Sequence, residues 1–218
     1  MSFYDSNLDG QVGEQLYIDY LNANNIKFID VRNDIECQQL DIDFIIPHGN
    51  NTKDDILKYV RHAHFNDRTQ RQQKIGYTVE VKLDKVTHNR YITKNGDISN
   101  GTGNLVYELI SHNMPGCLAR SYADFILYIC VDTFDEYTTL KKVYMINLFN
   151  WRNLMTQNNN LNMRLKPIAF VVENNKPVKE DILNILCPVQ NLLQYNNVIK
   201  DVTKKFEKFF PNNLILKN

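Results

Sequence analysis

The segment Gly76–Asp84, which reads GYTVEVKLD, constrains the fold of this chain more than any other. Its apolar and polar side chains alternate, with Tyr77, Val79, Val81 and Leu83 set against Thr78, Glu80, Lys82 and Asp84. A period of two is that of a β-strand, whose successive side chains point to opposite faces. The apolar face must cover a core, so the strand belongs to a sheet. Glu80 and Lys82 then emerge side by side from the other face, directed outward or into a cleft.

The rest of the chain combines strands with helices. Apolar residues at helical spacing predict a first helix over Gly13–Asn24, and the later patterns predict four more. These later helices are Lys53–His64, within the insertion, and Asn150–Gln157, Lys179–Leu193 and Val198–Phe210. The predicted strands are Ile26–Val31, Asp41–Pro47, Gly76–Asp84, Leu105–Ile110, Asp124–Val131, Val143–Leu148 and Pro167–Glu173. We therefore expect an α/β fold with a mixed central β-sheet flanked by helices.

The length and composition favour one intracellular domain. A chain of 218 residues is long enough for one substantial core and only marginally for two. We divide it into a core at about 10–150, an insertion at about 48–75 and a C-terminal helical extension at about 150–218. The longest apolar run, Phe125–Val131, is too short to span a membrane, and the first residues show no secretory signal. The four cysteines are widely scattered, which predicts reduced thiols and a cytoplasmic location.

The charge is unevenly distributed along the chain although its net value is zero. Residues 1–52 carry nine acidic and two basic side chains, whereas residues 53–94 carry five acidic and ten basic ones. The basic block is either a solvated surface or a contact with the phosphates of a nucleic acid, and composition alone favours neither. Its candidate phosphate-binding residues are Lys53, Lys58, Arg61, Arg68, Arg71 and Lys74.

Asp43 adds a second carboxylate to the pair on the alternating strand. If its strand lies beside Gly76–Asp84, then Asp43 and Glu80 converge on one point with the Lys82 ammonium next to them. Two carboxylates suit Mg²⁺, which can polarise a phosphoryl oxygen and activate a bound water. A nearby lysine can orient that water or neutralise charge on the phosphate. The common alternative for a Glu-x-Lys pair is a solvated strand face with cross-strand ion pairs.

The order of these residues resembles the PD-(D/E)xK nuclease superfamily, which includes restriction enzymes and Holliday-junction resolvases. Its pattern of a helical Glu, an Asp and a strand Glu-x-Lys matches Glu14, Asp43, Glu80 and Lys82. The continuation EVKLD, TGNLVYE and SYADFILY is similar to a phage-type branch of this superfamily, and the likeness covers about residues 10–150. The resemblance implies a restriction-endonuclease-like core of order αβββαβ and an endonuclease that requires Mg²⁺ or Mn²⁺. Its implied metal ligands are Asp43, Glu80 and Val81.

The resemblance also implies supporting residues and leaves one choice open. Glu14 and Glu108 are further candidate catalytic carboxylates, each set against an ordinary structural role, whereas Asp124 is expected to stabilise the fold. The residue before Asp43 is Ile42 rather than Pro, and the gap to Glu80 is long enough for an added flap. Asp41 therefore competes with Asp43, which we favour because Phe44-Ile45-Ile46 follows it directly.

Four functions are compatible with these residues. The first is a DNA endonuclease. We expect it in the cytoplasm, either of its own cell or, for a viral or phage protein, of the host cell. The second is an RNA endonuclease of the same fold. A non-catalytic module that binds nucleic acid or protein, and a structural or inhibitory partner in a larger complex, are the others. The resemblance favours DNA as the partner, no membrane, and a homodimer.

Overall fold

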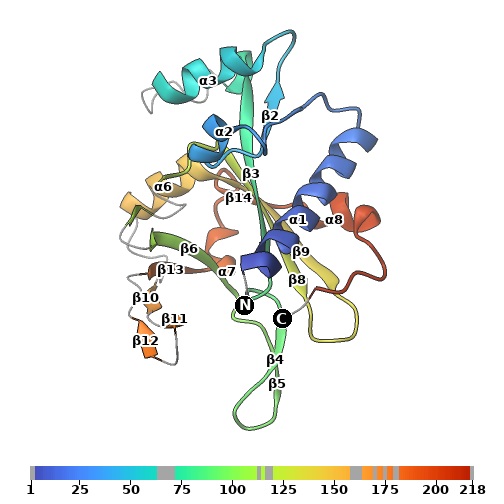
Figure 1. Cartoon of the computed structure of the whole chain (residues 1–218), viewed down its shortest axis with the longest axis vertical. Helices are drawn as coiled ribbons and strands as arrows, with labels where there is room; N and C mark the ends of the chain where they lie inside the picture. The colour runs from blue at the N-terminus through green and yellow to red at the C-terminus, as the bar shows by residue number, and fades with distance from the viewer. Residues whose placement is uncertain are drawn as a thin grey trace.

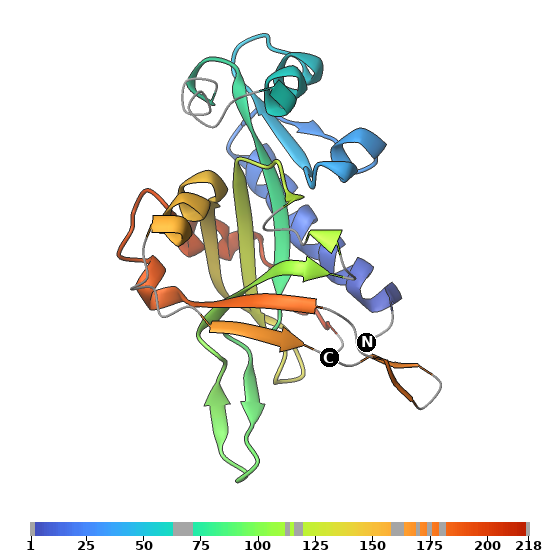
Figure 2. The ribbon, with the colours of Figure 1, turned by 90° about the vertical axis from the view of Figure 1, so that its left-hand side faces the viewer.

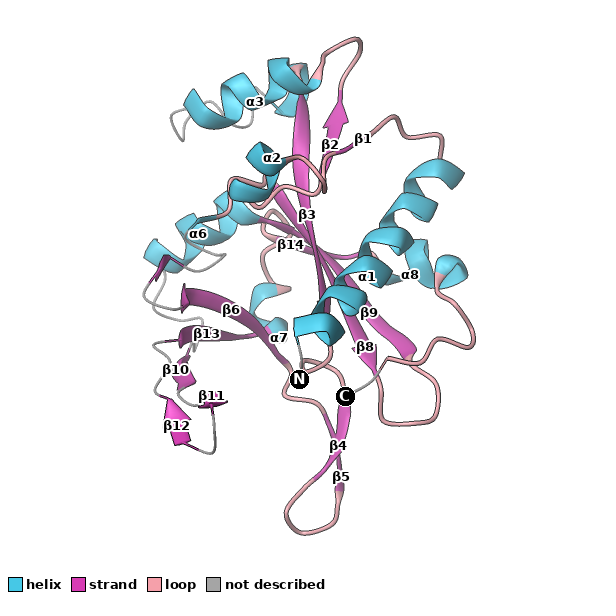
Figure 3. Cartoon of the chain, viewed as in Figure 1, coloured by secondary structure: helices cyan, strands magenta, loops and turns pink. Residues whose placement is uncertain are grey.

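The computed structural model of the chain describes residues 3–62, 72–111, 114–115, 120–157, 164–168, 171–173, 176–178 and 182–216. Figure 1 shows the whole chain and Figure 3 separates its helices from its strands. Within these residues, no helix combines the length and the apolar character that a membrane crossing requires.

A six-stranded mixed sheet forms the centre of the fold, as the sequence predicts (Figure 1). Its strands in spatial order are β1 (Ile29–Asp30), β2 (Phe44–Pro47), β3 (Gly76–Asp84), β8 (Phe125–Asp132), β9 (Thr139–Asn147) and β14 (Ile199–Asp201). The pair β3–β8 is parallel, and the other neighbours are antiparallel. The strand that carries Glu80 and Lys82 therefore lies in the middle of the sheet.

The order of elements agrees in part with the expected αβββαβ core. Helix α1 is followed by β1, β2 and β3, and β8 lies parallel to β3, but four strands, β4 to β7, come between β3 and β8 in the chain. Helices α2 (Ile35–Gln39) and α3 (Lys53–His62) lie between these strands. The helix expected before β8 stays a prediction, because Arg120 is helical but residues 116–119 are outside the described part of the chain.

Helix α1 (Phe3–Ala23) covers one face of the central sheet (Figure 1). Leu16, Tyr17 and Leu21 recur at helical spacing and are almost fully buried. They pack against the apolar side chains of β3 and against β8, including Val79, Val81, Leu127 and Ile129. The apolar half of the alternation in Gly76–Asp84 thus faces α1, as its period predicts.

The insertion before β3 is a packed part of the fold. Its helix α3 buries Ile56, Leu57 and Val60 against Val31, Cys37, Ile42 and Ile45. The apolar face of α3 thus completes a third core cluster, and the interpretation of residues 48–75 as an added flap stays a prediction, because residues 63–71 lie outside the described part of the chain. Asp54, Asp55 and Lys58 of α3 are exposed on its other side.

A second sheet lies across the face of the central sheet that α1 does not cover (Figure 2). Its order is β10 (Arg164–Ile168), β13 (Ile182–Pro188), β6 (Asn104–Ser111) and β7 (Met114–Pro115). Helices α6 (Leu148–Gln157) and α7 (Val189–Leu192) pack in the same core cluster as this sheet. Trp151, Leu105, Cys187 and Leu192 form the core between these elements and β8, β9 and β14.

The C-terminal part contradicts the expected helical extension. Strand β13 occupies the middle of Lys179–Leu193, where only Val189–Leu192 is helical among the described residues. Val198–Phe210 divides into β14, helix α8 (Thr203–Phe206) and a 3₁₀ turn at Glu207–Phe209. A short apolar run does not by itself separate a buried strand from a helix. Here the backbone of β13 is paired on both edges, with β6 and with β10, so pairing decides in favour of the strand.

Two hairpins complete the chain. One consists of β4 (Arg90–Ile92) and β5 (Ile98–Asn100) and extends away from the sheets (Figure 2). The other consists of β11 (Val171–Glu173) and β12 (Lys176–Val178). Cys37, Cys130 and Cys187 are buried free thiols, as the scattered cysteines predict, and Cys117 lies outside the described residues.

Gly76 starts β3 in a conformation that generates a testable prediction. Its φ is +133°, and a Cβ there would lie 2.4 Å from the Ile46 carbonyl oxygen and 2.9 Å from the Pro47 Cα. Gly76→Ala must therefore displace backbone, and we expect a loss of about 3 kcal/mol or more in the free energy of unfolding. Gly96→Ala is the control, because φ is also positive (+86°) but the space is open. That change should cost about 1–2 kcal/mol. Equal losses in urea denaturation would contradict the steric account.

Candidate active site at the end of strand β2

Asp43, the residue directly before β2, is hydrogen-bonded to β3. The first residue of β2, Phe44, pairs with Val79, and the Asp43 N–H donates to the Val79 carbonyl at 3.0 Å. The Asp43 carboxylate then accepts a hydrogen bond of 2.7 Å from the Val81 N–H. A side chain thus takes the place that one more residue of β2 would occupy, and β3 continues past it.

The same geometry places the Val81 carbonyl beside the Asp43 carboxylate. The N–H and C=O of one strand residue point toward the same neighbouring strand. Since the Val81 N–H points to Asp43, the Val81 carbonyl also lies on that edge of β3. Carboxylate and carbonyl oxygens are ligands of the kind that Mg²⁺ accepts.

Glu80 and Lys82 lie together on the face opposite Val81. Their ion pair joins Lys82 Nζ and Glu80 Oε1 at 2.7 Å. The Glu80 side chain is only 6% exposed, whereas that of Lys82 is 41% exposed. Glu80 Oε2 is buried and has no hydrogen-bond partner among the residues that the structure describes. A buried carboxylate oxygen without a donor is costly, so this atom is suited to accept a cation or a proton.

Burial and neighbouring negative charges raise the pKa values of the Asp43 and Glu80 carboxyl groups. The pKa of Asp43 is raised to about 7, mainly by burial, to which the charges of Glu80 and Glu14 add, whereas the Val81 hydrogen bond and the Lys82 charge oppose the rise. Burial also raises the pKa of Glu80, with Lys82 acting in the opposite direction and Asp41 adding to the rise. A bound divalent cation would relieve this repulsion, because it favours the charged form of both groups.

Helix α1 brings Glu14 toward this site. The helix approaches β3 at Gly13, where a Cβ would lie 3.4 Å from side-chain atoms of Val81 and Leu83. Glu14 forms an ion pair of 2.7 Å with Arg32, and Arg32 is also bound by Asp30. Glu14 therefore contributes its charge to Asp43 while its own carboxylate is held by an arginine. No local sequence pattern indicates a role for Arg32, because its partner Glu14 lies 18 residues earlier.

Asp41 occupies a different position from Asp43. Its backbone is left-handed, with φ of +51°, and its carboxylate accepts hydrogen bonds of 2.8 and 3.1 Å from Arg120. Asp41 is near enough for its charge to act on Glu80, but Asp43 is the residue whose carboxylate contacts β3. The geometry thus separates the two acids that the sequence left in competition.

The remaining residues of the family-like pattern have other positions. Glu108 lies on β6 opposite Asn184, in the second sheet, and its side chain is outside the described part, so its catalytic role stays a prediction. Asp124 is fully buried and accepts hydrogen bonds from the Thr78 N–H and hydroxyl, which ties β8 to β3 as a fold-stabilising residue would. Gly103 lies in the loop before β6, and its N–H donates to the Thr87 carbonyl.

The basic residues of the insertion are only partly described. Lys53 forms an ion pair of 2.6 Å with Asp34, so part of its charge is already neutralised. Lys58 and Lys74 are exposed. Arg68 and Arg71, as well as the side chain of Arg61, lie outside the described residues, and contact with phosphate stays a prediction for this segment.

The capacity of the site for a metal depends on two carboxylates. Among the described residues, no group of three or more His, Cys, Asp or Glu side chains is arranged to hold a metal ion. Mg²⁺ commonly takes one or two carboxylates from a protein and completes its shell with water and substrate oxygens. Asp43, Glu80 and the Val81 carbonyl fit that smaller requirement in the chemistry of their atoms.

Comparison with protein-family models, with curated proteins and with solved structures found no match for this chain.

The raised pKa of Asp43 generates a prediction about stability. Its pKa is about 7 in the folded chain, against an ordinary 3.8, so the folded state binds more protons between about pH 4 and pH 7. This carboxyl group therefore lowers stability as the pH rises through that window. We expect Asp43→Asn to raise the free energy of unfolding by about 2 kcal/mol more at pH 8 than at pH 5.

Urea denaturation at the two pH values measures this difference. Asparagine keeps an oxygen that can accept the Val81 hydrogen bond, so the change mainly removes the charge. Asp97→Asn is the control, because Asp97 is an exposed carboxylate in the β4–β5 turn. A gain of the same size at both pH values, or a pH-dependent gain in the control, would contradict the assignment.

Proposed function

We propose that the chain is a metal-dependent endonuclease of the PD-(D/E)xK type with a restriction-endonuclease-like core, and that it hydrolyses phosphodiester bonds of DNA. The observation that carries the proposal is the junction of β2 and β3. There, Asp43 contacts Val81 at 2.7 Å, and the neighbouring Glu80 is bound to Lys82 at 2.7 Å. Residues 38 positions apart thus provide a half-buried carboxylate at Asp43, a buried one at Glu80 and a partly exposed lysine next to them.

Each residue has a defined task in this proposal. Asp43, Glu80 and the Val81 carbonyl would hold Mg²⁺ or Mn²⁺, and Glu14 would add negative charge on the α1 side. When bound, the metal supplies a polarised phosphoryl oxygen and a water of lowered pKa. Lys82 can neutralise charge that builds on the phosphate oxygens, because its side chain is 41% exposed while its ammonium group is held next to Glu80.

Two properties of the site support turnover over plain binding. The site is asymmetric, with carboxylates buried and the ammonium partly exposed, so an anionic substrate would meet the lysine first. The buried Glu80 Oε2 and the raised pKa of Asp43 also suit a divalent cation, whose charge a binding module has no need of. The RNA endonuclease remains the second candidate, because none of these residues distinguishes ribose from deoxyribose. Homodimer formation also stays a prediction.

Substitution of the three residues tests the proposal. Lys82→Ala should reduce cleavage by a factor of about 10²–10³ in Mg²⁺ or Mn²⁺, as loss of a transition-state charge contact does. Asp43→Asn and Glu80→Gln should remove metal binding together with cleavage. Lys94→Ala and Glu136→Gln are matched controls, because both residues are exposed and lie outside the site.

Cleavage is measured on single-stranded, double-stranded and branched DNA and on the same set of RNA, with circular dichroism to show that each variant is folded. Binding of Mn²⁺ is measured separately by electron paramagnetic resonance. Cleavage that persists in folded Lys82→Ala and Asp43→Asn would overturn the proposal. Tight nucleic-acid binding by the wild-type chain without cleavage in any divalent metal would support the non-catalytic module instead.

A further inference from the structure

A pocket lined by lysines lies at the β14 edge of the central sheet. It has a volume of about 360 Å³, and Lys141 and Lys142 of β9 line it together with Lys204, Lys205, Asp201 and Glu207. The pairing of β9 with β14 brings these two parts of the chain together, although about 60 residues separate them. We call this site the lysine pocket.

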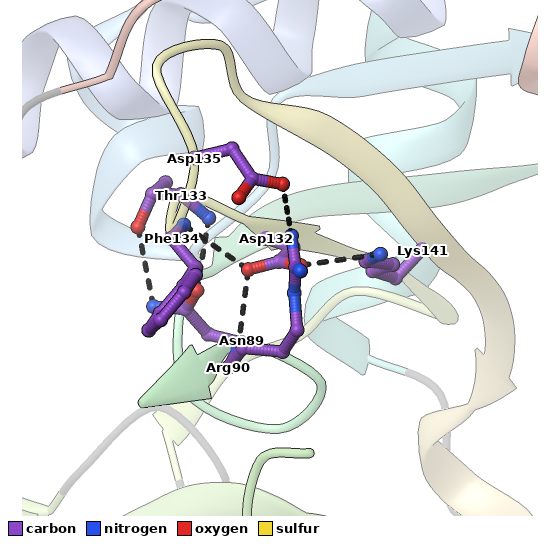
Figure 4. A network of polar contacts seen from close by, with 7 residues as sticks. All are labelled: Asn89, Arg90, Asp132, Thr133, Phe134, Asp135 and Lys141. Atoms are coloured by element: carbon purple, nitrogen blue, oxygen red, sulfur yellow. Dashed lines mark hydrogen bonds and ion pairs between the residues drawn. The ribbon is translucent and has the colours of Figure 1, made fainter. Parts of the chain in front are cut away.

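Buried and half-buried carboxylates hold the two lysines of β9 in place. Lys141 Nζ is 3.1 Å from Asp132, which is fully buried and also binds Arg90, and Figure 4 shows this network with Asp135. Lys142 Nζ is 2.7 Å from Asp201. Asp201 in turn accepts a hydrogen bond of 3.0 Å from the Thr203 N–H. The β9 side of the pocket is therefore built by the fold and does not depend on loose surface side chains.

Lys204 and Lys205 supply the charge that is not neutralised. Both are exposed, and neither has an ion-pair partner within the described part of the chain. Because Lys141 and Lys142 are each paired with a carboxylate, Lys204 and Lys205 against Glu207 leave an excess of one positive charge. A concave surface with two lysines unpaired within the described residues is suited to phosphate, which lysine binds as a point charge.

The position of the pocket fits a strand that also reaches the candidate active site. In one row of paired residues, Lys82 is opposite Tyr128, Tyr128 is opposite Tyr144, and Tyr144 is opposite Asp201. Three strand spacings separate the backbones of Lys82 and Asp201, which is about 14 Å. Tyr128 and Tyr144 are buried beneath the second sheet and α6, so a nucleic-acid strand that contacts both sites passes around this cover. The two contacts are therefore at least about four base pairs apart, at 3.4 Å each.

We propose that the lysine pocket binds phosphate groups of the nucleic-acid strand several nucleotides away from the bond at the Asp43–Glu80–Lys82 site. The inference rests on the proposed function for the identity of the ligand as a substrate. It adds a second contact that positions the strand and moves the main phosphate contact from the insertion to β9 and α8. The contact carries no base information, so it serves affinity and register.

Binding without cleavage tests the pocket. The full chain is titrated into a fluorescent 20-base-pair DNA duplex in EDTA, from 50 to 200 mM KCl, with anisotropy as the readout. For Lys204→Ala/Lys205→Ala we expect the slope of log Kd against log salt to fall by about 1.8, and Kd to rise on the order of tenfold at low salt. The control is Lys94→Ala/Lys208→Ala, which removes two exposed lysines that do not line the pocket.

A second readout separates the pocket from the chemistry. Cleavage of a small phosphodiester, bis(4-nitrophenyl) phosphate, should be unchanged in the pocket variant, whereas KM for long DNA should rise. Inorganic phosphate should compete with DNA no more than chloride of equal ionic strength does. Strong competition by phosphate would make the free anion the ligand and overturn the proposal.

The outcomes distinguish this inference from the proposed function. Equal loss of affinity in the pocket variant and the control would overturn the pocket, since general charge would explain both. DNA cleavage by the wild type together with unchanged binding by the pocket variant would also overturn it, and would leave the nuclease proposal intact. A selective loss of binding in a chain that never cleaves nucleic acid would support the pocket and overturn the nuclease.

Discussion

The hydrogen bond between the Asp43 carboxylate and the Val81 N–H is the contact on which the candidate site depends. Because β2 begins only at Phe44, the edge of β3 beyond Val79 has no strand beside it among the described residues, and the Asp43 side chain completes the pairing. The charged Asp43 carboxylate thus occupies a position that the backbone of a neighbouring strand would otherwise fill. It also leaves the Val81 carbonyl directed to the same edge. The raised pKa of Asp43 is the energetic consequence, since the carboxylate is buried beside two other acids.

The central sheet changes character between β3 and β8. Along one row of paired residues the side chains are Lys82, Tyr128 and Tyr144, and along the next they are Glu80, Ile126 and Ile146. The face that carries the polar pair on β3 is thus apolar on β8 and β9, where the second sheet and α6 cover it. Glu80 lies at this border, which explains how a strand with alternating polar residues buries a glutamate. The more distant end of Lys82 stays partly exposed.

The sequence was sufficient where the information is local and insufficient where pairing decides. Alternation in Gly76–Asp84 predicted that Glu80 and Lys82 lie together, and the apolar run after Asp43 correctly indicated the strand that binds to β3. The helix predicted over Lys179–Leu193 failed because β13 takes its conformation from β6 and β10, which no local pattern records. The lysine pocket was missed for the same reason: Lys142 and Asp201 are neighbours only through the pairing of β9 with β14.

The buried acids also bear on the choice between turnover and binding. A module that only binds nucleic acid needs positive charge at its surface, and the lysine pocket supplies it without any buried carboxylate of β3. Asp43 and Glu80 place negative charge in a poorly solvated position, which binding to nucleic acid does not require. Their raised pKa values reflect the cost of this arrangement to stability. Such strain is expected at functional sites, where the arrangement serves chemistry at the expense of stability. A divalent cation would convert the repulsion between Asp43 and Glu80 into coordination, which gives the costly arrangement a physical reason.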